Sequence, residues 1–285
     1  MNGRAALLID PDTEVMNALI HVLRPPEWDI QTAVDNLQAL SLVQTARFDL
    51  ILTSARSSGR EDVDLLRKIR RVHSHTQVII LTDQSTPQDV IDAIREGAFS
   101  YFSHPFSVPA LADMVRSAIE GPRWDDGIEL LIAKPEWLRL AARCDLGTAD
   151  RMLQFVQEMI ELPEGEKNEV ASALRELLVN AMEHGGKLDP EKYVELTYLR
   201  TKRAVSCRIK DPGVGFSLSE ISHAAVANPP DDPLRHINYR QAESLRPGGF
   251  GLLLARNSVD ELIYSDKGNE VLLIKYLDHD RQPAD

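Results

Sequence analysis

Residues 4–120 alternate five times between a short apolar run and a longer amphipathic stretch, an order that few folds accommodate. The apolar runs predict strands at 5–9, 28–34, 48–53, 77–82 and 100–106, and the amphipathic stretches predict helices at 13–23, 36–46, 61–72, 86–97 and 108–120. A continuous apolar run, such as residues 78–81, suits a strand that helices cover on both faces. Five consecutive βα units therefore predict a doubly wound, five-stranded parallel α/β sheet of flavodoxin-like order.

The remainder of the chain follows a break in this pattern at residues 121–127, where GPRWDDG combines turn formers with charges. We expect an N-terminal domain over residues 1–121, a linker over 122–134 and a second domain over 135–285. Extended segments are expected at 130–133, 136–142, 193–200, 204–210, 261–265 and 271–277, and helices at 148–162, 166–185 and 253–259.

The composition of the 285 residues is that of a soluble globular protein, with 43% hydrophobic and 27% charged residues. The net charge of −12 argues against nucleic-acid binding, which needs a basic surface, and leaves protein partners open. The two cysteines, Cys144 and Cys207, form no CxxC, so we expect neither a disulfide framework nor a zinc site, and a cytoplasmic location. We expect no membrane association, because no apolar run approaches the length of a transmembrane helix.

The N-terminal half resembles a response-regulator receiver domain along its whole length. The segment FDLILTSARSSGREDVDLLRKIR (48–70) is similar to the family's third strand, phosphorylation loop and third helix. In VIILTD (78–83), Thr82 falls at the switch hydroxyl, and Tyr101 falls at the switch aromatic. His104 begins HPF, which falls on the family's Lys-Pro-Phe. The resemblance implies a phosphorylation pocket at the carboxyl ends of the strands.

Several residues of that pocket depart from the family pattern. Ser54 stands at the phospho-acceptor Asp and His104 at the Lys, and of the acidic pair only Asp10 is present, beside Pro11, with Asp12 a partial substitute. Aspartyl phosphorylation needs a carboxylate nucleophile, a metal held by acids and a fixed cation. We therefore expect a pseudo-receiver that serves docking, dimerisation or partner sensing. The opposing hypothesis is a phospho-accepting regulator with an ATPase output.

Three motifs in the second half combine residue types that bind nucleotides. Glu176 and Asn180 lie one helical turn apart, and an Asn is a poor helix former, so its presence there calls for a reason. The motif DPGVG (211–215) places an acid at a strand end before a Gly-x-Gly loop, which lets a ligand approach the backbone. The motif GGFGL (248–252) opens a helix whose N–H groups favour an anion.

In this order and spacing the motifs resemble the N, G1 and G2 boxes of the GHKL ATPases (gyrase, Hsp90, histidine kinase, MutL). The resemblance implies an α+β Bergerat ATPase sandwich that binds ATP and Mg²⁺, with residues 216–247 as a lid. Asn269 replaces the Thr that usually supports the adenine contact. The implied roles are general base for Glu176, Mg²⁺ ligand for Asn180, adenine binding for Asp211, Gly213 and Gly215, and phosphate binding for Gly249 and Gly251.

The second half most resembles the anti-sigma-factor serine kinases of the RsbW/SpoIIAB type, over residues 135–280. No room for a phosphorylatable helical hairpin is expected between residues 120 and 130, and no transducer domain is expected after the ATPase domain. The resemblance implies an ATP-dependent serine kinase that phosphorylates a STAS-domain antagonist, can bind a sigma factor and forms a homodimer. The alternative is a non-catalytic, nucleotide-gated binding module, which Asn269 and the Pro-rich segment 228–233 favour.

Overall fold

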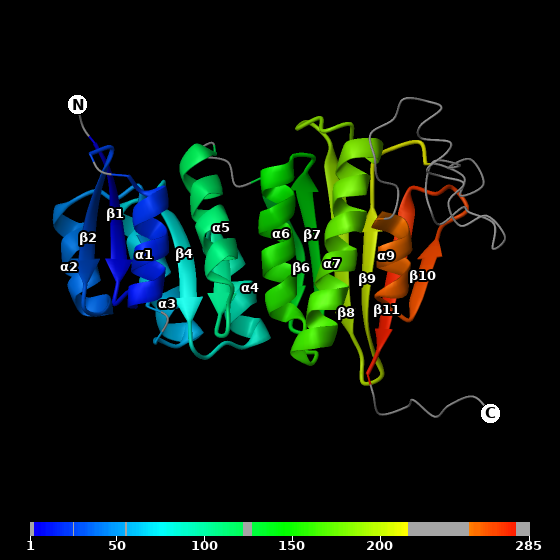
Figure 1. The fold of residues 1–285 in the computed structure, drawn as a ribbon, viewed down its shortest axis with the longest axis horizontal. Helices are drawn as coiled ribbons and strands as arrows, with labels where there is room; N and C mark the ends of the chain where they lie inside the picture. The colour runs from blue at the N-terminus through cyan, green and yellow to red at the C-terminus, as the bar shows by residue number, and fades with distance from the viewer. Residues whose placement is uncertain (1–2, 25, 55, 122–126, 216–250, 278–285) are drawn as a thin grey trace. The chain divides into compact units, whose positions relative to one another are not determined.

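The computed structural model describes residues 3–24, 26–54, 56–121, 127–215 and 251–277 (Figure 1). The chain divides into two units. The first comprises residues 1–127 together with 154–159, and the second comprises residues 128–153 together with 160–285. Among the described residues, none of the helices is both long enough and apolar enough to cross a membrane.

The first unit is built on a parallel sheet in the order β2-β1-β3-β4-β5. Its strands are β1 (Arg4–Ile9), β2 (Trp28–Ala33), β3 (Leu50–Leu52), β4 (Gln77–Thr82) and β5 (Ser100–Ser103). All of β3 and nearly all of β4 are buried, as strands covered on both faces require. The observed order is the flavodoxin-like one, so the predicted fold is confirmed.

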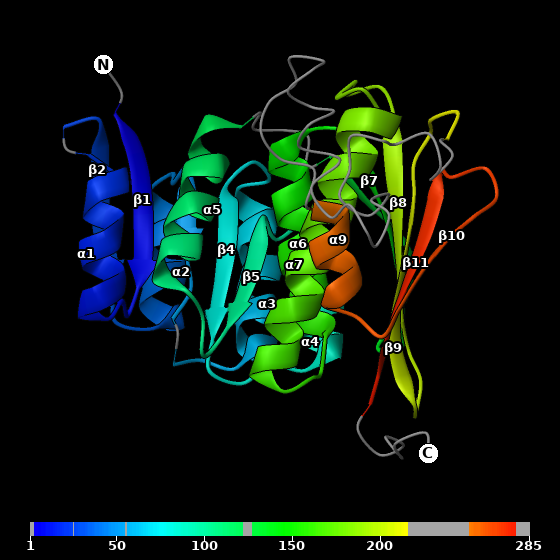
Figure 2. The same cartoon turned by 45° about the vertical axis from the view of Figure 1, so that its right-hand side comes forward.

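Helices cover both faces of this sheet (Figure 2). They are α1 (Thr13–Val22), α2 (Asn36–Thr45), α3 (Gly59–Val72), α4 (Pro87–Arg95) and α5 (Val108–Glu120). Each begins after a side chain that accepts a hydrogen bond from a backbone N–H of the first turn, and these capping residues are Asp12, Asp35, Ser58, Thr86 and Ser107. Helices α1 and α5 pack against each other, while α2, α3 and α4 form a separate row. These local capping interactions thus fix the residue at which each helix begins.

The second unit is built on a six-stranded antiparallel sheet in the order β10-β11-β9-β8-β7-β6. Its strands are β6 (Ile128–Lys134), β7 (Trp137–Arg143), β8 (Tyr193–Arg200), β9 (Ala204–Lys210), β10 (Glu261–Tyr264) and β11 (Glu270–Tyr276). Leu140, Leu196, Ile209 and Val271 are paired across four neighbouring strands and all are buried. One face of the sheet therefore carries the core.

Helices α7 (Glu164–Asn180) and α9 (Gly251–Asn257) lie on one face of this sheet and contact each other (Figure 2). A π-helix, η1 (Ala181–Gly185), continues α7 without a break. Helix α6 (Leu146–Met159) begins in the second unit, and its last six residues are assigned to the first unit. The C-terminal fold is thus an antiparallel sheet plus helices, consistent with the predicted α+β ATPase sandwich.

Two boundaries differ from those expected from the sequence. Residues 128–134, which we expected in the linker, form β6, the edge strand beside β7. The single helix expected over residues 166–185 is α7 followed by η1, because the backbone widens into a π-helical turn before Gly186. The extended segment expected at 130–133 lies within β6, but its pairing with β7, which places it in the second domain, is a contact that the sequence pattern does not show. A π-helix differs from an α-helix only in backbone pairing, so hydrophobic periodicity does not register η1.

Candidate functional site

Helix α7 carries the acid and the amide of the first motif in its last two turns. Asn180 Nδ2 donates a hydrogen bond to Glu176 Oε1 at 3.0 Å, and both side chains are partly buried. This bond uses the amide nitrogen, which leaves the amide oxygen of Asn180 as the group that a hard cation would bind. The amide nitrogen of Asn180 therefore faces the Glu176 carboxylate, and its amide oxygen is left for another partner.

The π-helix η1 directly follows this pair and ends at Gly185, which lies against Asp211. A Cβ atom on Gly185 would come within 2.2 Å of Asp211 Oδ1, and one on Gly213 would come within 2.7 Å of the same oxygen. Single π-helical turns occur frequently at functional sites. The absence of side chains at these two glycines is what allows the Asp211 carboxylate to occupy its position.

Asp211 follows β9 immediately and is half-buried. Burial raises the pKa of its carboxyl group, while the hydrogen bond from Gly213 N to Oδ1, at 2.7 Å, and the charge of Lys267 oppose this shift. Asn269 makes two hydrogen bonds with the backbone of Asp211. Asp211 N donates to Asn269 O at 3.0 Å, and Asn269 Nδ2 donates to Asp211 O at 3.3 Å. Asn269 thus anchors the acid through the main chain.

Gly215 closes the second motif with a positive φ of 86°, in the region that favours glycine. A Cβ atom on Gly215 would come within 1.8 Å of the carbonyl oxygen of Lys267. The turn between β10 and β11 therefore packs directly on the Gly-x-Gly loop, and no other residue type fits at this contact.

Gly251, the first residue of α9, belongs to the third motif and lies against Glu176 of the first motif. A Cβ atom on Gly251 would come within 1.8 Å of Glu176 Oε1. The structure therefore brings Glu176, Asn180, Asp211, Gly213 and Gly251 together at the same end of the second unit. Gly249 and the expected lid, residues 216–247, lie outside the described residues.

The residues present fit ATP and Mg²⁺ in kind. Asp211 provides an acceptor for an amino group between glycines whose added Cβ atoms would clash, and Asn180 provides an oxygen ligand. In the described part of the chain, no cluster of three or more His, Cys, Asp or Glu could hold a metal ion. Mg²⁺ at this site would therefore depend on Asn180 together with phosphate oxygens and water, which is how Mg²⁺ is commonly bound beside nucleotides.

The receiver pocket of the first unit holds Asp10, Ser54 and a residue that the sequence did not single out, Arg56. Arg56 Nε donates to Asp10 Oδ2 at 2.7 Å, Arg56 Nη2 contacts Oδ1, and Ser54 Oγ donates to Oδ2 at 3.3 Å. Asp12 caps α1 by accepting from Val15 N at 2.7 Å. Of the two acids expected in this pocket, Asp10 therefore pairs with the Arg56 guanidinium, and Asp12 is the N-cap of α1.

Of the remaining receiver residues, Thr82 ends β4, Tyr101 lies within β5 and His104 follows β5. Thr82 Oγ1 donates to the carbonyl oxygen of Ser57 at 2.7 Å. Tyr101 is fully buried, and burial raises the pKa of its hydroxyl well above the usual range. His104 is exposed, and its ring centroid lies 4.5 Å from that of Phe106. The switch hydroxyl is thus engaged by the loop after β3.

A buried carboxylate in α3 also escaped sequence reasoning. Asp62 has no exposed surface, accepts a hydrogen bond from Ser57 Oγ at 2.7 Å, and burial raises its pKa to about 7. Its neighbours in sequence, Glu61 and Asp64, are exposed helix acids, so the pattern GREDVDLL carries no signal that one acid of the three is buried. Gly185 and Lys267 at the second site were also missed, because their contacts with Asp211 and Gly215 join segments that are distant in sequence.

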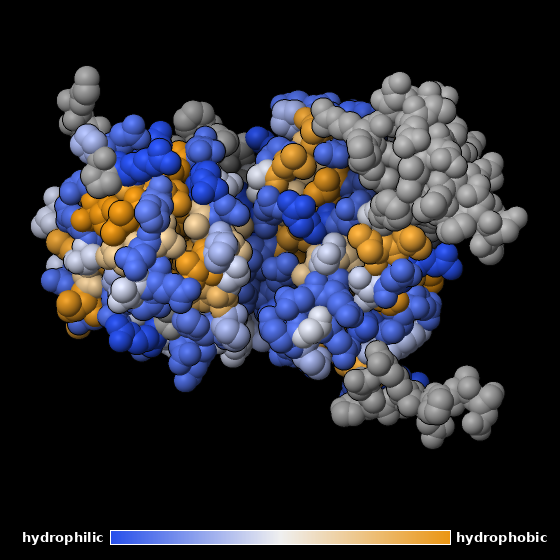
Figure 3. Space-filling model, viewed as in Figure 1, coloured by the Kyte–Doolittle hydropathy of each residue, from blue (hydrophilic) through white to orange (hydrophobic). Residues whose placement is uncertain are grey.

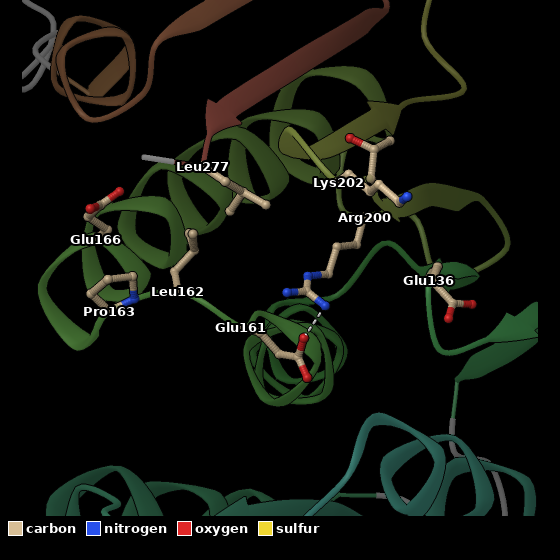
Figure 4. A pocket seen from close by; sticks show the side chains of 9 residues that line it. Glu136, Glu161, Leu162, Pro163, Glu166, Arg200, Lys202 and Leu277 are labelled. Atoms are coloured by element: carbon tan, nitrogen blue, oxygen red, sulfur yellow. Dashed lines mark ion pairs between the residues drawn. The ribbon is translucent and has the colours of Figure 1, made fainter. Parts of the chain in front are cut away.

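A separate cleft of about 730 Å³ lies at the other end of α7 (Figure 4). Its charged lining includes Glu166 and an ion pair between Arg200 and Glu161. Glu166 precedes Glu176 by ten residues, which corresponds to roughly 15 Å along a helix. The cleft is therefore distinct from the candidate nucleotide site.

Comparisons with known proteins identify the two halves of the chain separately. Residues 6–116 match the family model of the response regulator receiver domain, and residues 141–275 match that of the histidine kinase-like ATPase domain. The chain therefore contains a receiver domain and a histidine kinase-like ATPase domain. This pairing indicates a regulatory ATP-binding protein.

Curated relatives are similar over part of the chain. Transcriptional regulatory protein GlrR of Escherichia coli (strain K12) is 26% identical over 150 residues, which are 49% of this chain and 34% of that protein. DNA-binding response regulator MtrA of Mycobacterium tuberculosis (strain CDC 1551) is 30% identical over 113 residues, 40% of this chain and 49% of that protein. The chain thus spans about a third to a half of the length of these relatives.

A receiver domain of known structure is also similar. The signal receiver domain of an HD domain-containing protein from Pseudomonas fluorescens Pf-5 is 28% identical, with 42% of this chain and 96% of that chain covered and a TM-score of 0.36.

Proposed function

We propose that this protein is an ATP-dependent serine/threonine-protein kinase and anti-sigma-type regulator of a partner-switching system, with a serine of a STAS-domain antagonist as its substrate. The observation that carries the proposal is the convergence of three separate motifs: Glu176 lies against Gly251 and beside Asn180, and Gly185 brings the end of the same helix to Asp211. A nucleotide and a base are needed at one place for phosphoryl transfer.

The roles follow from the chemistry of each group. Asp211 accepts a hydrogen bond from the adenine amino group, and Gly213 and Gly215 allow the base to approach the backbone. Asn180 supplies an oxygen to Mg²⁺, which neutralises phosphate charge when bound. Glu176 accepts the proton of the substrate serine hydroxyl as its oxygen bonds to the γ-phosphorus and the bond to the β-phosphate oxygen breaks. Positioning and charge neutralisation supply most of the catalysis.

The partners belong to the same proposal. We place the protein in the cytoplasm, acting on a small STAS-domain protein, with a sigma factor as a further partner and with a second copy of this chain in a homodimer. The net charge of −12 supports protein partners over nucleic acid. The receiver domain, whose pocket lacks the acceptor Asp, serves in this scheme as a docking or sensing module.

The second candidate function is a nucleotide-gated binding module without phosphoryl transfer. Asn269 favours it, because its side chain is used to hold the main chain of Asp211 where the related ATPases carry a Thr. Under this alternative, ATP changes the affinity for a partner, and Glu176 has no chemical task.

The deciding experiment measures transfer of labelled γ-phosphate from Mg-ATP into proteins of the native host's lysate. The Glu176→Ala variant should abolish a labelled band that the wild type produces, since removal of a catalytic base costs roughly a hundredfold or more. Glu183→Ala, which removes an exposed acid from η1, is the matched control and should retain the label. Wild-type ATP binding without any Glu176-dependent label would reject the kinase in favour of the binding module.

A further inference from the structure

The receiver pocket contains a cation supplied by the chain itself. The Arg56 guanidinium faces Asp10 with two nitrogens, Nε at 2.7 Å from Oδ2 and Nη2 in contact with Oδ1. This fork places one donor on each carboxylate oxygen, the arrangement in which an Arg–carboxylate pair is most specific. Both oxygens of the acid that directly follows β1 are therefore engaged.

The loop that carries Arg56 is tied to the pocket at successive residues. Arg56 N donates to Ser54 Oγ at 3.1 Å. The single hydroxyl proton of Ser57 lies between two acceptors, Ser54 O at 2.6 Å and Asp62 Oδ2 at 2.7 Å. The carbonyl oxygen of Ser57 accepts from Thr82 Oγ1 at 2.7 Å and from Asp83 N at 3.0 Å. The hydroxyls at the acceptor and switch positions thus bond to groups of the protein itself.

These residues do not fit the divalent metal that receiver domains bind. A hard cation needs several oxygen ligands, yet Pro11 offers no side-chain ligand, Ser54 offers a hydroxyl in place of a carboxylate, and Asp10 is occupied by Arg56. Where the structure describes the chain, no group of three or more His, Cys, Asp or Glu could hold a metal ion. The guanidinium already balances Asp10, the one acid of the family's pair that is present, and Asp12 caps α1.

We propose that Arg56 takes the place of the metal in this receiver and holds its pocket in one arrangement without Mg²⁺ or phosphate. The pocket is then a self-neutralised structural element, and the state of the receiver is independent of divalent cations and of phosphodonors. This inference concerns the first unit alone and does not rest on the proposed kinase activity.

The test measures Mn²⁺ binding to the full chain by electron paramagnetic resonance, without nucleotide, in a set of variants. Ser54→Asp restores a second carboxylate, and Ser54→Asp with Arg56→Met also removes the internal cation. Arg60→Met combined with Ser54→Asp is the matched control, because Arg60 is an exposed Arg of the adjacent helix α3 and the variant loses the same charge. Asp10→Asn in each background identifies binding in this pocket.

The expected result is that wild type shows no Asp10-dependent Mn²⁺ binding. The Ser54→Asp, Arg56→Met variant should bind Mn²⁺ at least roughly tenfold more tightly than Ser54→Asp alone or the Arg60→Met control, because the acid pair is freed from a competing cation. Asp10-dependent binding by wild type would overturn the proposal. Equal affinity of Ser54→Asp with and without Arg56 would overturn it too, since Arg56 would then not compete for Asp10.

Discussion

Asp10 and Asp211 each follow a strand directly, β1 in one unit and β9 in the other, yet their surroundings differ. Both oxygens of Asp10 face the Arg56 guanidinium, whereas Asp211 lies against two glycines and accepts from the Gly213 backbone. An acid at a strand end is thus unavailable to a ligand when a cation of the chain pairs with it, as at Asp10. It stays available as a hydrogen-bond acceptor when its neighbours are glycines, as at Asp211. The acid of the receiver pocket is neutralised within the chain, whereas the acid of the candidate nucleotide site stays available as an acceptor for a ligand.

Figure 3 shows that apolar patches occur over elements of both units on one face of the molecule. Apolar surface is visible over α9, where Leu254 is 62% exposed, next to the candidate nucleotide site.

The largest effect is expected from the buried acid of the receiver, Asp62. Its pKa is raised to about 7 by burial, so its contribution to stability is fully present below about pH 4 and is lost as the pH rises through about 7. In wild type this titration should change the free energy of unfolding by about 4 kcal/mol, and Asp62→Asn should abolish that change. The stability of Asp62→Asn relative to wild type should therefore rise toward pH 8.

Urea unfolding of the full chain between pH 4 and 8 measures this difference, with Asp64→Asn as the matched control because Asp64 is an exposed acid of the same helix. Parallel pH profiles for wild type and Asp62→Asn would show that Asp62 titrates normally. The environment of Asp62 would then resemble that of an exposed acid, and the contrast with the half-buried Asp211 would fail.

The next effect concerns Asp211, the open acceptor. Asp211→Asn should weaken ATP binding roughly a hundredfold, because loss of a charge-assisted hydrogen bond in a partly buried site costs about 2–3 kcal/mol. Isothermal titration with ATP measures the change, and Asp266→Asn, an exposed acid in the turn after β10, should bind as wild type does. Unchanged affinity in Asp211→Asn would mean that the acid is structural, as Asp10 is.

A smaller effect is expected from substitution of Gly185, whose lack of a side chain leaves room for the Asp211 carboxylate. In Gly185→Ala the added Cβ would come within 2.2 Å of Asp211 Oδ1, so the carboxylate must move at a cost of about 1–2 kcal/mol. ATP affinity should fall roughly tenfold by the same titration. Gly165→Ala in the first turn of α7, where nothing lies within 4 Å of the new Cβ, is the control and should leave binding intact.

The smallest effect is expected from the ion pair between Arg56 and Asp10. Arg56→Met should lower the free energy of unfolding by about 0–1 kcal/mol, because the Arg56 side chain is 70% exposed and surface ion pairs contribute little. A double-mutant cycle with Asp10→Asn, followed by thermal unfolding, measures the coupling. A much larger coupling would show that the pocket depends on this pair for folding, as well as for neutralising Asp10.

The sequence predicted much of the fold because its signals are local. Alternating apolar runs identified the five βα units, and β8 (Tyr193–Arg200) and β9 (Ala204–Lys210) begin and end at the expected residues. The motif residues of the candidate site were identified in the same way, from their types and spacing. The roles assigned to them, and to Gly249 in particular, stay predictions.

What the sequence by itself determined was the order of strands and helices, the residue types of three motifs and the loss of the receiver's acceptor Asp at Ser54. Only the tertiary structure decided that Arg56 reaches Asp10, 46 residues away, and that Asn269 holds Asp211, 58 residues away. The physical reason is that periodicity and capping depend on residues a few positions apart. Charge neutralisation and close packing at a glycine depend on which distant segment the fold brings alongside.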